Sequence, residues 1–390
     1  MGDSIIGPGS TIGILGGGQL GRMLAMEAKK MGYRVVTLDP TPDSPCGQVA
    51  DEQIVASFDD VEAAVTLAGK CDVITYEFEN VAASVVEQLE KIQMVHPASH
   101  ILRFTQNRVA EKSLLRELNI EVADFDVIRG QDDLERAGEH IGLPAILKTT
   151  SGGYNGKGQY IVKDRGQALS AYQRLKMSSV EELVWERFVP FVKEVSVICA
   201  RTSTGEVASY PVAENIHRDN ILYMSIVPAQ ISPATERKAR EIAETIVSGL
   251  GVVGVIGIEM FLMEDGTLLV NEIAPRPHNS GHYTLDACQA SQFEQQLRAI
   301  CGLPLASTAL LSPVVMINIL GEGLGNRLDG VEEALKDPNI KLHLYGKIEA
   351  KAKRKMGHLC ALAESVVEAI ERAEMAKSKL RWCNMSRGAV

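Results

Sequence analysis

The stretch 257–282 reads GIEMFLMEDGTLLVNEIAPRPHNSGH and constrains what this chain can fold into more than any other. Two apolar, β-prone runs, residues 258–263 and 267–273, flank the dipeptide Asp265-Gly266. This dipeptide is favoured in two-residue hairpin turns, because both positions tolerate positive φ. The stretch therefore predicts a β-hairpin.

The turn also predicts the register of the hairpin. With that dipeptide at the centre, Glu264 pairs with Thr267, and counting back sets Glu259 opposite Glu272. Directly opposed side chains have Cβ atoms roughly 5 Å apart, and like charges there are destabilising unless a positive charge lies between them. Oxygen ligands at this spacing suit magnesium. The alternative is a surface hairpin with both glutamates in water, but the polar, proline-stiffened exit 275–282 is costly unless it binds something.

The composition narrows the class of protein. A chain of 390 residues with 45% hydrophobic and 23% charged residues predicts two or three soluble globular domains. A formal net charge of −10 disfavours a general nucleic-acid binder. The sequence has no apolar run long enough for a membrane span and no signal-peptide pattern, so we expect a cytoplasmic protein without a membrane partner. The seven cysteines include no CxxC pair, and neither zinc nor a disulfide framework is indicated.

The N-terminal region reads as strand, glycine turn and helix. It satisfies the dinucleotide fingerprint G-x-G-x-x-G, followed by an acidic residue, at Gly16, Gly18, Gly21 and Asp39. Such a turn lets any phosphate approach a helix N-terminus, so a ribose phosphate would serve as well as a pyrophosphate. Two further strands, 73–78 and 94–96, complete a small α/β domain near residue 104, whereas a full dinucleotide fold needs a second half. An NAD-dependent dehydrogenase stays an alternative.

Charged residues at strand ends and inside strands mark a second group of candidates. Glu77 and Glu79 share one side of a strand end, where open α/β sheets bind ligands, although a solvated acidic loop fits as well. Lys148 lies in strand 145–150 among apolar neighbours and needs an anionic partner, for which phosphate is suitable. The helix 106–118 carries a row of basic residues, which is usually a solvated face. This row comprises Arg108, Lys112 and Arg116.

The loop 151–159, SGGYNGKGQ, is the most glycine-dense segment of the chain. It fails the Walker A pattern, because the glycine spacing is one residue short and Gly158 stands where the hydroxyl should be. We therefore interpret it as a lid whose backbone amides fold over phosphates; the alternative is a long hairpin loop. Further on, 214–220 reads as a polar turn containing His217, Ser232-Pro233 as a helix start, and 350–359 as a basic cluster.

The order of these motifs resembles that of the ATP-grasp ligases, and most closely the members that carboxylate aminoimidazole ribonucleotide in purine biosynthesis. The resemblance spans Thr11 to about Trp382 and is carried by GILGGGQLGRM, TYEFENV, KTTSGGYNGKGQ, ENIHRDNIL, NEIAPRPHNSGH and KRKMGHL. The formate-dependent glycinamide ribonucleotide formyltransferase shares NE-x-x-PRPH but tends to continue with Asp-Thr-Gly. This chain has Asn279, Ser280 and Gly281 there, which favours the carboxylating enzymes.

The resemblance implies an α/β ATP-grasp fold with an N-terminal Rossmann-like pre-ATP-grasp domain and a small C-terminal domain. The implied division is a flexible extension at 1–10, a substrate-binding domain at 11–104, an ATP-grasp domain at 105–300 with a lid at about 118–186, and a C-terminal domain at 301–390.

The resemblance also implies the site residues. ATP would be held by Arg108, Lys148, Gly153, Tyr154, Asn155, Gly156, Lys157, Gly158, Gln159, Glu186, Glu194, His217, Asn271 and Glu272. Magnesium, or manganese in its place, would be bound by Glu259, Asn271 and Glu272. Aminoimidazole ribonucleotide would contact Gly18, Gln19, Leu20, Glu77, Asn80, Arg276, His278, Asn279, Ser280, Arg354 and Lys355. The catalytic candidates are Lys148, Tyr154, His217 and Arg276.

The implied reaction is ATP-dependent carboxylation of aminoimidazole ribonucleotide by bicarbonate through carboxyphosphate, in a homodimer. The alternatives are the formate-dependent formyltransferase or another ATP-grasp ligase, a nucleotide-binding regulatory module without turnover, and the dehydrogenase.

Overall fold

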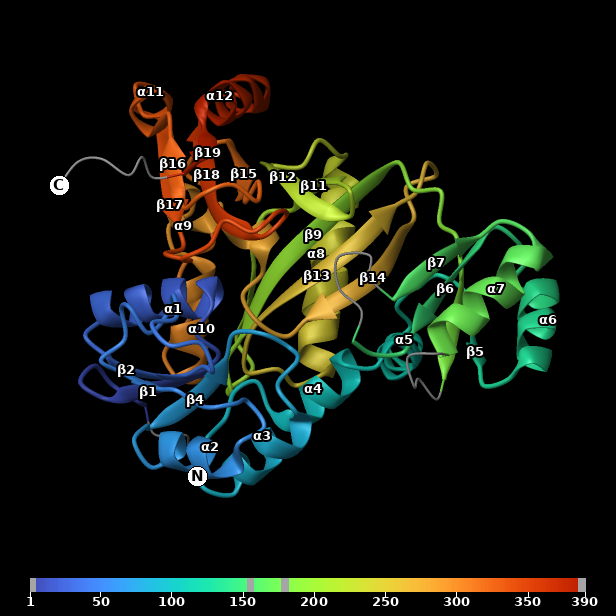
Figure 1. Ribbon diagram of the computed structural model, residues 1–390, viewed down its shortest axis with the longest axis horizontal. Coiled ribbons are helices and arrows are strands. Elements are labelled where there is room, and N and C mark those ends of the chain that lie inside the picture. Colours follow the sequence, from blue (N-terminus) through green and yellow to red (C-terminus); the bar gives the residue numbers. More distant parts are fainter. Residues whose placement is uncertain (1–4, 153–157, 177–181, 385–390) are drawn as a thin grey trace.

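The computed structural model describes residues 5–152, 158–176 and 182–384. Its three main parts are an N-terminal parallel sheet, a small lobe, and a long central sheet that continues into the C-terminal region (Figure 1). Among the described residues, no helix is both long and apolar enough to cross a membrane.

The N-terminal part is a four-stranded parallel sheet in the order β3-β2-β1-β4. Its strands are β1 (Thr11–Leu15), β2 (Arg34–Leu38), β3 (Glu52–Ile54) and β4 (Val73–Tyr76), and its helices are α1 (Gln19–Lys30), α2 (Val61–Ala68), α3 (Ala83–Glu90) and α4 (Ser99–Thr105). The predicted strand 73–78 ends at Tyr76. The predicted strand 94–96 is wrong, because Val95 forms only an isolated bridge to Ile74. The predictions omitted the three-residue β3 and helix α4.

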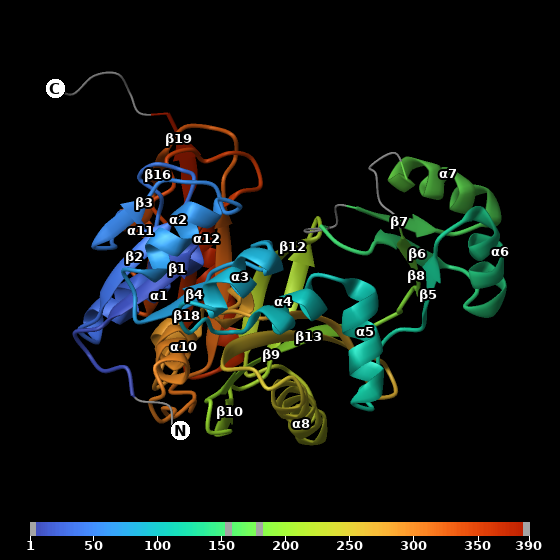
Figure 2. The ribbon, with the colours of Figure 1, turned by 90° about the horizontal axis from the view of Figure 1, so that it is seen from below.

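The small lobe is an antiparallel sheet in the order β5-β8-β6-β7. Its elements are β5 (Phe125–Ile128), α6 (Gln131–His140), β6 (Ala145–Thr149), β7 (Gln159–Val162), α7 (Arg165–Lys176) and β8 (Leu183–Arg187). Helix α5 (Arg108–Glu117) precedes it. Figure 2 shows α6 and α7 on the side of this sheet that faces away from the central sheet. Trp185 and Leu147 lie in the core between this sheet and the two helices.

The central sheet has the strand order β14-β13-β9-β11-β12-β15-β18-β17, with β10 paired to β9. Its strands are β9 (Lys193–Arg201), β10 (Val207–Ser209), β11 (Ala213–Arg218), β12 (Ile221–Val227), β13 (Gly254–Leu262), β14 (Leu268–Ala274), β15 (Val314–Leu320), β17 (Ile340–Leu344) and β18 (Lys355–Leu362). Because β12 pairs with β15, the C-terminal region extends the same sheet.

Helices cover this sheet on both sides. The helices of this region are α8 (Pro233–Gly249), the 3-10 turn η1 (Asn279–Gly281), α9 (Thr284–Ala287), α10 (Gln292–Ile300), α11 (Val331–Ala334) and α12 (Val366–Lys379). A separate two-stranded sheet pairs β16 (Arg327–Asp329) with β19 (Arg381–Cys383). Helix α8 begins as predicted: the Ser232 side chain accepts a hydrogen bond from the Thr235 amide, and Pro233 is the first helical residue. Its apolar face, which includes Ala239, Ile242 and Ile246, packs into the main core.

The β13–β14 hairpin sets Glu259 opposite Glu272, as predicted. The predicted two-residue turn is wrong, because Met263, and not Glu264, pairs with Thr267. The loop therefore holds three residues and not two, and this shifts the pairing of the two strands by one position. A bulge in β14 then restores the predicted pairing, since Met260 faces Val270 while the next residue, Glu259, faces Glu272. The register prediction succeeded because two departures from a regular hairpin cancel.

The polar turn predicted at 214–220 is also wrong over most of its length. Residues up to Arg218 form β11, and only Asp219 and Asn220 form the turn to β12. Both have positive φ, of 51° and 60°, which Asp and Asn tolerate better than most side chains. His217 therefore lies on a strand of the central sheet and not in a loop.

Candidate active site

A cleft of about 380 Å³ lies where the central sheet, the small lobe and the N-terminal domain meet. Its polar and charged lining comes from all three parts and from the segment after β14. These residues include Glu79, Asn80, Arg108, Glu111, Lys148, Gln159, Glu194, His217, Glu259, Asn271, Glu272, Arg276, His278, Asn279 and Lys355. Residues far apart in sequence thus share one cleft.

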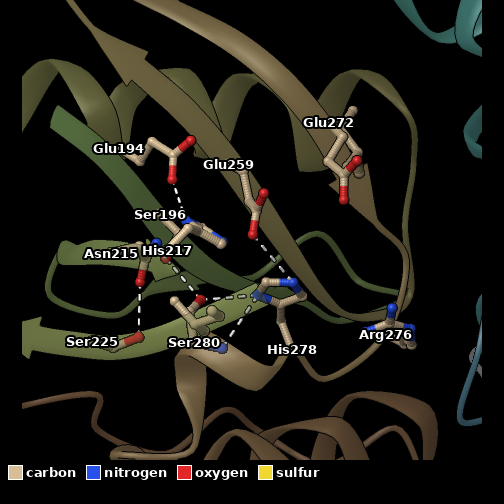
Figure 3. A network of polar contacts seen from close by, with 12 residues as sticks. Glu194, Ser196, Asn215, His217, Ser225, Glu259, Glu272, Arg276, His278 and Ser280 are labelled. Carbon is tan, nitrogen blue, oxygen red and sulfur yellow. Dashed lines mark hydrogen bonds and ion pairs between the residues drawn. The ribbon is translucent and has the colours of Figure 1, made fainter. Parts of the chain in front are cut away.

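The bulge in β14 shapes the acidic end of this cleft. A bulge places two residues of one strand opposite one residue of the other, so consecutive side chains can reach the same side. Here Asn271 and Glu272 both line the cleft with Glu259. Figure 3 shows Glu259 and Glu272 on the two strands of the hairpin. Burial, and then the charge of Glu272, raises the pKa of Glu259 to about 7. Such crowded carboxylates favour a cation.

A metal would need ligands beyond these side chains. Among the described residues, no group of three or more His, Cys, Asp or Glu side chains could hold a metal ion alone. Magnesium usually takes one or two carboxylates and completes its shell with water and substrate phosphates. The donor set of Glu259, Glu272 and the Asn271 amide fits a metal that arrives with a nucleotide.

Lys148 is buried at the base of the small lobe, and its partner is a protein carboxylate. Its Nζ donates to Glu186 Oε1 at 3.0 Å, and Lys112 Nζ lies 3.4 Å from the other oxygen, Oε2. Burial lowers the pKa of Lys148. Burial alone would raise the pKa of Glu186, but the two lysines outweigh it and lower that pKa.

This cluster corrects one interpretation of the sequence. Lys112 is 1% exposed, so it does not belong to a solvated row. The sequence carried one signal for this burial, because the apolar Leu115 three residues later lies on the same face of the helix as Lys112. Glu186 itself does not line the cleft, but it accepts a hydrogen bond from Lys148, whose side chain does line the cleft.

His217 lies beside a second carboxylate. Its Nδ1 pairs with Glu194 Oε2, and both residues line the cleft. Burial alone would lower the pKa of His217, but the hydrogen bond and charge of Glu194 outweigh it and raise that pKa. The pair therefore favours a protonated imidazole near Glu259.

Arg276 connects the central domain to the N-terminal domain. Its Nε donates to Glu79 Oε2, and its Nη1 donates to the Pro277 carbonyl at 3.1 Å. Burial alone would raise the pKa of Glu79, but Arg276 outweighs it and lowers that pKa. A guanidinium held in this way has a fixed orientation toward the cleft.

Basic side chains from the C-terminal region lie near Arg276. Lys355 lines the cleft, and burial, followed by the charge of Arg276, lowers its pKa to about 8. Lys347, which the sequence analysis missed, donates to the Lys355 carbonyl at 2.7 Å, and burial lowers its pKa to about 8 as well. In the sequence, only the closeness of Lys347 to the basic cluster 350–359 could have indicated that it belongs with Lys355. Arg354 is exposed, contacts the Glu349 carbonyl at 3.4 Å, and does not line the cleft.

The glycine turn of the N-terminal domain is engaged by the protein itself. The amides of Gly18 and Gly21 donate to Glu77, and the Gly17 amide donates to Asp39 Oδ2 at 2.7 Å. Burial raises the pKa of Glu77 despite these hydrogen bonds. Carboxylates thus take amides that a pyrophosphate would need, which argues against the dehydrogenase alternative.

The residues proposed from the sequence therefore fall into those that line the cleft and those that do not. Among the described residues, the cleft is not lined by Gly18, Gln19, Leu20, Glu77, Gly158, Glu186, Ser280 or Arg354. Gly153, Tyr154, Asn155, Gly156 and Lys157 lie outside the described residues. All other candidates line the cleft.

Gly257 gives His278 the space for its ring. A Cβ at Gly257 would lie 2.6 Å from His278 Cβ and 2.8 Å from Cγ, which no packed structure accommodates without movement. We expect Gly257→Ala to lower kcat at least about tenfold and the free energy of unfolding by about 1–3 kcal/mol, because the ring must shift. Steady-state kinetics and urea unfolding measure both. Gly138→Ala is the control, since its Cβ meets only one atom, at 4.0 Å; equal effects in the two variants would contradict the prediction.

Glu111 predicts a pH dependence of stability. Burial, and then the charge of Glu272, raises its pKa from 4.5 to about 8, so the folded state retains a proton that the unfolded state has released. The stability from this proton is present at low pH and is lost as pH rises from about 4.5 to about 8. We expect Glu111→Gln to be more stable than the parent at pH 9, by on the order of 1–3 kcal/mol, with little difference at pH 4. Urea unfolding across this range measures it. Glu117→Gln, exposed on the same helix, should change neither value; a parallel pH profile for Glu111→Gln and the parent protein would refute the prediction.

This fold and cleft define an ATP-grasp ligase. The family model described as ATP-grasp domain matches residues 113–293, the ribonucleotide synthetase preATP-grasp domain matches 10–106, and the phosphoribosylaminoimidazole carboxylase C-terminal domain matches 314–372. The N5-carboxyaminoimidazole ribonucleotide synthase of Bacillus subtilis strain 168 is 46% identical over 375 residues, which are 95% of this chain and 96% of the relative. That of Brucella melitensis biotype 1 is 47% identical over 354 residues, 90% of this chain and 96% of the relative. The chain belongs to the N5-carboxyaminoimidazole ribonucleotide synthase family.

Solved structures agree with this assignment. An ADP complex of an N5-carboxyaminoimidazole ribonucleotide synthetase has a TM-score of 0.90 and 48% identity, covering 96% of this chain and 98% of the other. The Aspergillus clavatus enzyme in complex with ADP and 5-aminoimidazole ribonucleotide has a TM-score of 0.86 and 35% identity, covering 95% and 98%. The chain is thus an ATP-grasp ligase of purine biosynthesis.

Proposed function

We propose that the chain carboxylates 5-aminoimidazole ribonucleotide with bicarbonate, at the expense of ATP, to give N5-carboxyaminoimidazole ribonucleotide, ADP and phosphate. The observation that carries this proposal is that one cleft has both an acidic end, at Glu259 and Glu272, and a basic end, at Arg276 and Lys355. The first end suits a nucleotide with its metal, and the second suits anions. The complex of an Aspergillus clavatus relative with ADP and 5-aminoimidazole ribonucleotide supports the same pair of ligands.

The acidic end would hold magnesium, or manganese, through Glu259, Asn271 and Glu272. Bound there with ATP, the metal would neutralise phosphate charge and polarise the γ-phosphoryl group. Arg108 and Lys148 line the same end and would hold the phosphates. Of the loop implied to cover them, Gly153 to Lys157 lie outside the described residues.

The chain's own residues must then bring two anions together. Bicarbonate is a poor nucleophile, and the γ-phosphate repels it, so cationic side chains have to offset the charge. Arg276, oriented by Glu79, and His217, paired with Glu194, line the same cleft and would place bicarbonate in line with the phosphorus. Attack by a bicarbonate oxygen breaks the bond to ADP and forms carboxyphosphate.

The final step transfers the carboxyl group. Carboxyphosphate decomposes to carbon dioxide and phosphate, and exclusion of water keeps the carbon dioxide beside the acceptor. The exocyclic amine of the ribonucleotide then bonds to the carbon, and its proton goes to the phosphate released with the carbon dioxide. Asn80, Asn279 and Lys355 line the region where the acceptor would lie.

The test is a substrate-dependence assay with purified protein. ADP release should require both bicarbonate and 5-aminoimidazole ribonucleotide, and labelled bicarbonate should appear in the product. Turnover with formate and glycinamide ribonucleotide would instead identify the formyltransferase. ATP binding without phosphate release under any condition would identify a regulatory module.

Three further features follow from family membership as proposals. We propose the domain division at 11–104, 105–300 and 301–390, a homodimer, and a cytoplasmic location. Limited proteolysis tests the first, sedimentation equilibrium tests the second, and fractionation of cells tests the third.

A further inference from the structure

A chain of hydrogen bonds crosses the central sheet and ends at His278 (Figure 3). Ser225 on β12 donates to Asn215 Oδ1 at 2.8 Å, and Asn215 Nδ2 donates to Ser196 Oγ at 2.8 Å. Ser196 Oγ lies 2.7 Å from Ser280 Oγ, which lies 2.9 Å from His278 Nδ1. All five side chains are buried, and that of His278 also lines the cleft.

The direction of this chain at the histidine follows from a backbone donor. Ser196 Oγ accepts from the Asn215 amide, which leaves its own proton available to Ser280, and the Ser280 hydroxyl can in turn donate to His278 Nδ1. A second donor agrees: the Ser280 backbone N–H also points at Nδ1, at 3.4 Å. A backbone amide can only donate, so Nδ1 has to present its lone pair.

The other ring nitrogen lies beside the cleft. His278 Nε2 is 3.5 Å from Glu259 Oε1, at the outer limit for a hydrogen bond, so an N–H at Nε2 stays available to a ligand in the cleft. A proton on Nδ1 would instead face the amide N–H of Ser280.

The residue that carries the ring is also held in place. Gln292 accepts from the His278 amide and donates to the His278 carbonyl, both at 2.8 Å. The base of the His278 side chain packs so closely on Gly257 of β13 that a Cβ there would have no room.

We propose that Ser280, backed by Ser196 and Asn215, is a positioning residue that fixes His278 as the tautomer protonated at Nε2, with that N–H directed into the cleft. His278 then acts as a hydrogen-bond donor to an anionic oxygen and not as a base at Nε2. This second part rests on the proposed function, in which that oxygen belongs to the bicarbonate-derived group. The tautomer itself is independent of the substrate.

The first test needs no substrate. Nitrogen-15 NMR of histidine-labelled protein distinguishes a protonated ring nitrogen from one with a lone pair, and the spectrum of His278→Gln assigns the His278 signals among the eight histidines. We expect a protonated Nε2 and an unprotonated Nδ1. The opposite pattern would overturn the proposal even if the enzyme carboxylates its substrate as proposed.

The second test separates positioning from stability. Ser280→Ala removes the hydroxyl at the ring, while Ser225→Ala removes a buried hydroxyl at the far end of the same chain. Ser280→Ala keeps the longer contact from the Ser280 amide, at 3.4 Å, and loses the shorter contact from the hydroxyl, at 2.9 Å. We expect this variant to lower kcat at least about tenfold with KM for ATP changed less than about twofold, and to increase the share of the His278 tautomer protonated at Nδ1. Ser225→Ala should retain kcat within about twofold and the parent's tautomer. Equal losses of kcat in the two variants, or an unchanged tautomer in Ser280→Ala, would overturn the proposal.

The third test asks whether His278 donates or accepts a proton. A glutamine amide can place an N–H near the position of Nε2 but cannot serve as a base. We expect His278→Gln to retain at least about tenfold more kcat than His278→Ala, in line with the loss of one hydrogen bond to a charged group. Equally low rates in both variants would contradict the donor role.

Discussion

Glu272→Gln is expected to lower kcat by about 100-fold to 1,000-fold while leaving the folded protein at least as stable as the parent. The amide keeps the shape of the side chain but loses the charge that would hold the metal. Stability should not fall, because Glu272 lies opposite Glu259 and adds to the rise in the pKa of both Glu259 and Glu111. Removing one of these like charges relieves repulsion in the protein without metal.

Initial rates at saturating ATP, together with thermal unfolding without metal, measure this prediction. Glu259→Gln should behave in the same way, and the loss should shrink when the concentration of magnesium or manganese is raised. Glu264→Gln is the matched control, since it makes the same change in the exposed loop of the same hairpin. Activity of Glu272→Gln within a few-fold of that control would remove the metal assignment.

Lys148→Met should lower kcat/KM for ATP at least about 100-fold and also destabilise the protein. The side chain lines the cleft and is bonded to the buried Glu186, so its removal takes one cation from the phosphate end and one partner from a buried carboxylate. We expect the free energy of unfolding to fall by about 1–3 kcal/mol, less than for a lone buried pair, because Lys112 remains beside Glu186.

Lys112→Met separates the two consequences. It also removes one partner of Glu186, but Lys112 does not line the cleft. We expect a similar loss of unfolding free energy with a kcat/KM reduced by no more than about tenfold. If the two variants lose activity equally, Lys148 acts only through Glu186 and has no contact with the phosphates.

Local patterns were sufficient for the elements with strong periodicity or clear end signals. The alternation of apolar residues with a turn dipeptide predicted the β13–β14 hairpin, and Ser232-Pro233 predicted where α8 begins. The strand at 94–96 failed because three residues carry too little pattern to separate a strand from a single bridge. The turn at 214–220 failed because its polar residues suggested a loop, while pairing with β9 and β12 makes most of it a strand.

Burial could not be inferred from residue type at charged positions. Lys112 and Arg116 both belong to helix α5, yet Lys112 is buried beside Glu186 of strand β8, whereas Arg116 is exposed. Likewise the sequence of the glycine turn did not show that Asp39 and Glu77, which follow strands β2 and β4, accept hydrogen bonds from the amides of Gly17, Gly18 and Gly21. Such partners are set by packing between segments that are far apart in the chain.

The sequence by itself determined the hairpin of 257–282, the lysine inside β6 and the resemblance to the ATP-grasp ligases, because each depends on residues that are close together in the chain. Only the tertiary structure decided that Glu79 orients Arg276, that Lys347 joins the basic end, and that Ser280 faces His278 instead of the cleft. Those contacts join side chains from different strands and domains. Their geometry depends on how sheets and helices pack, and no local pattern encodes it.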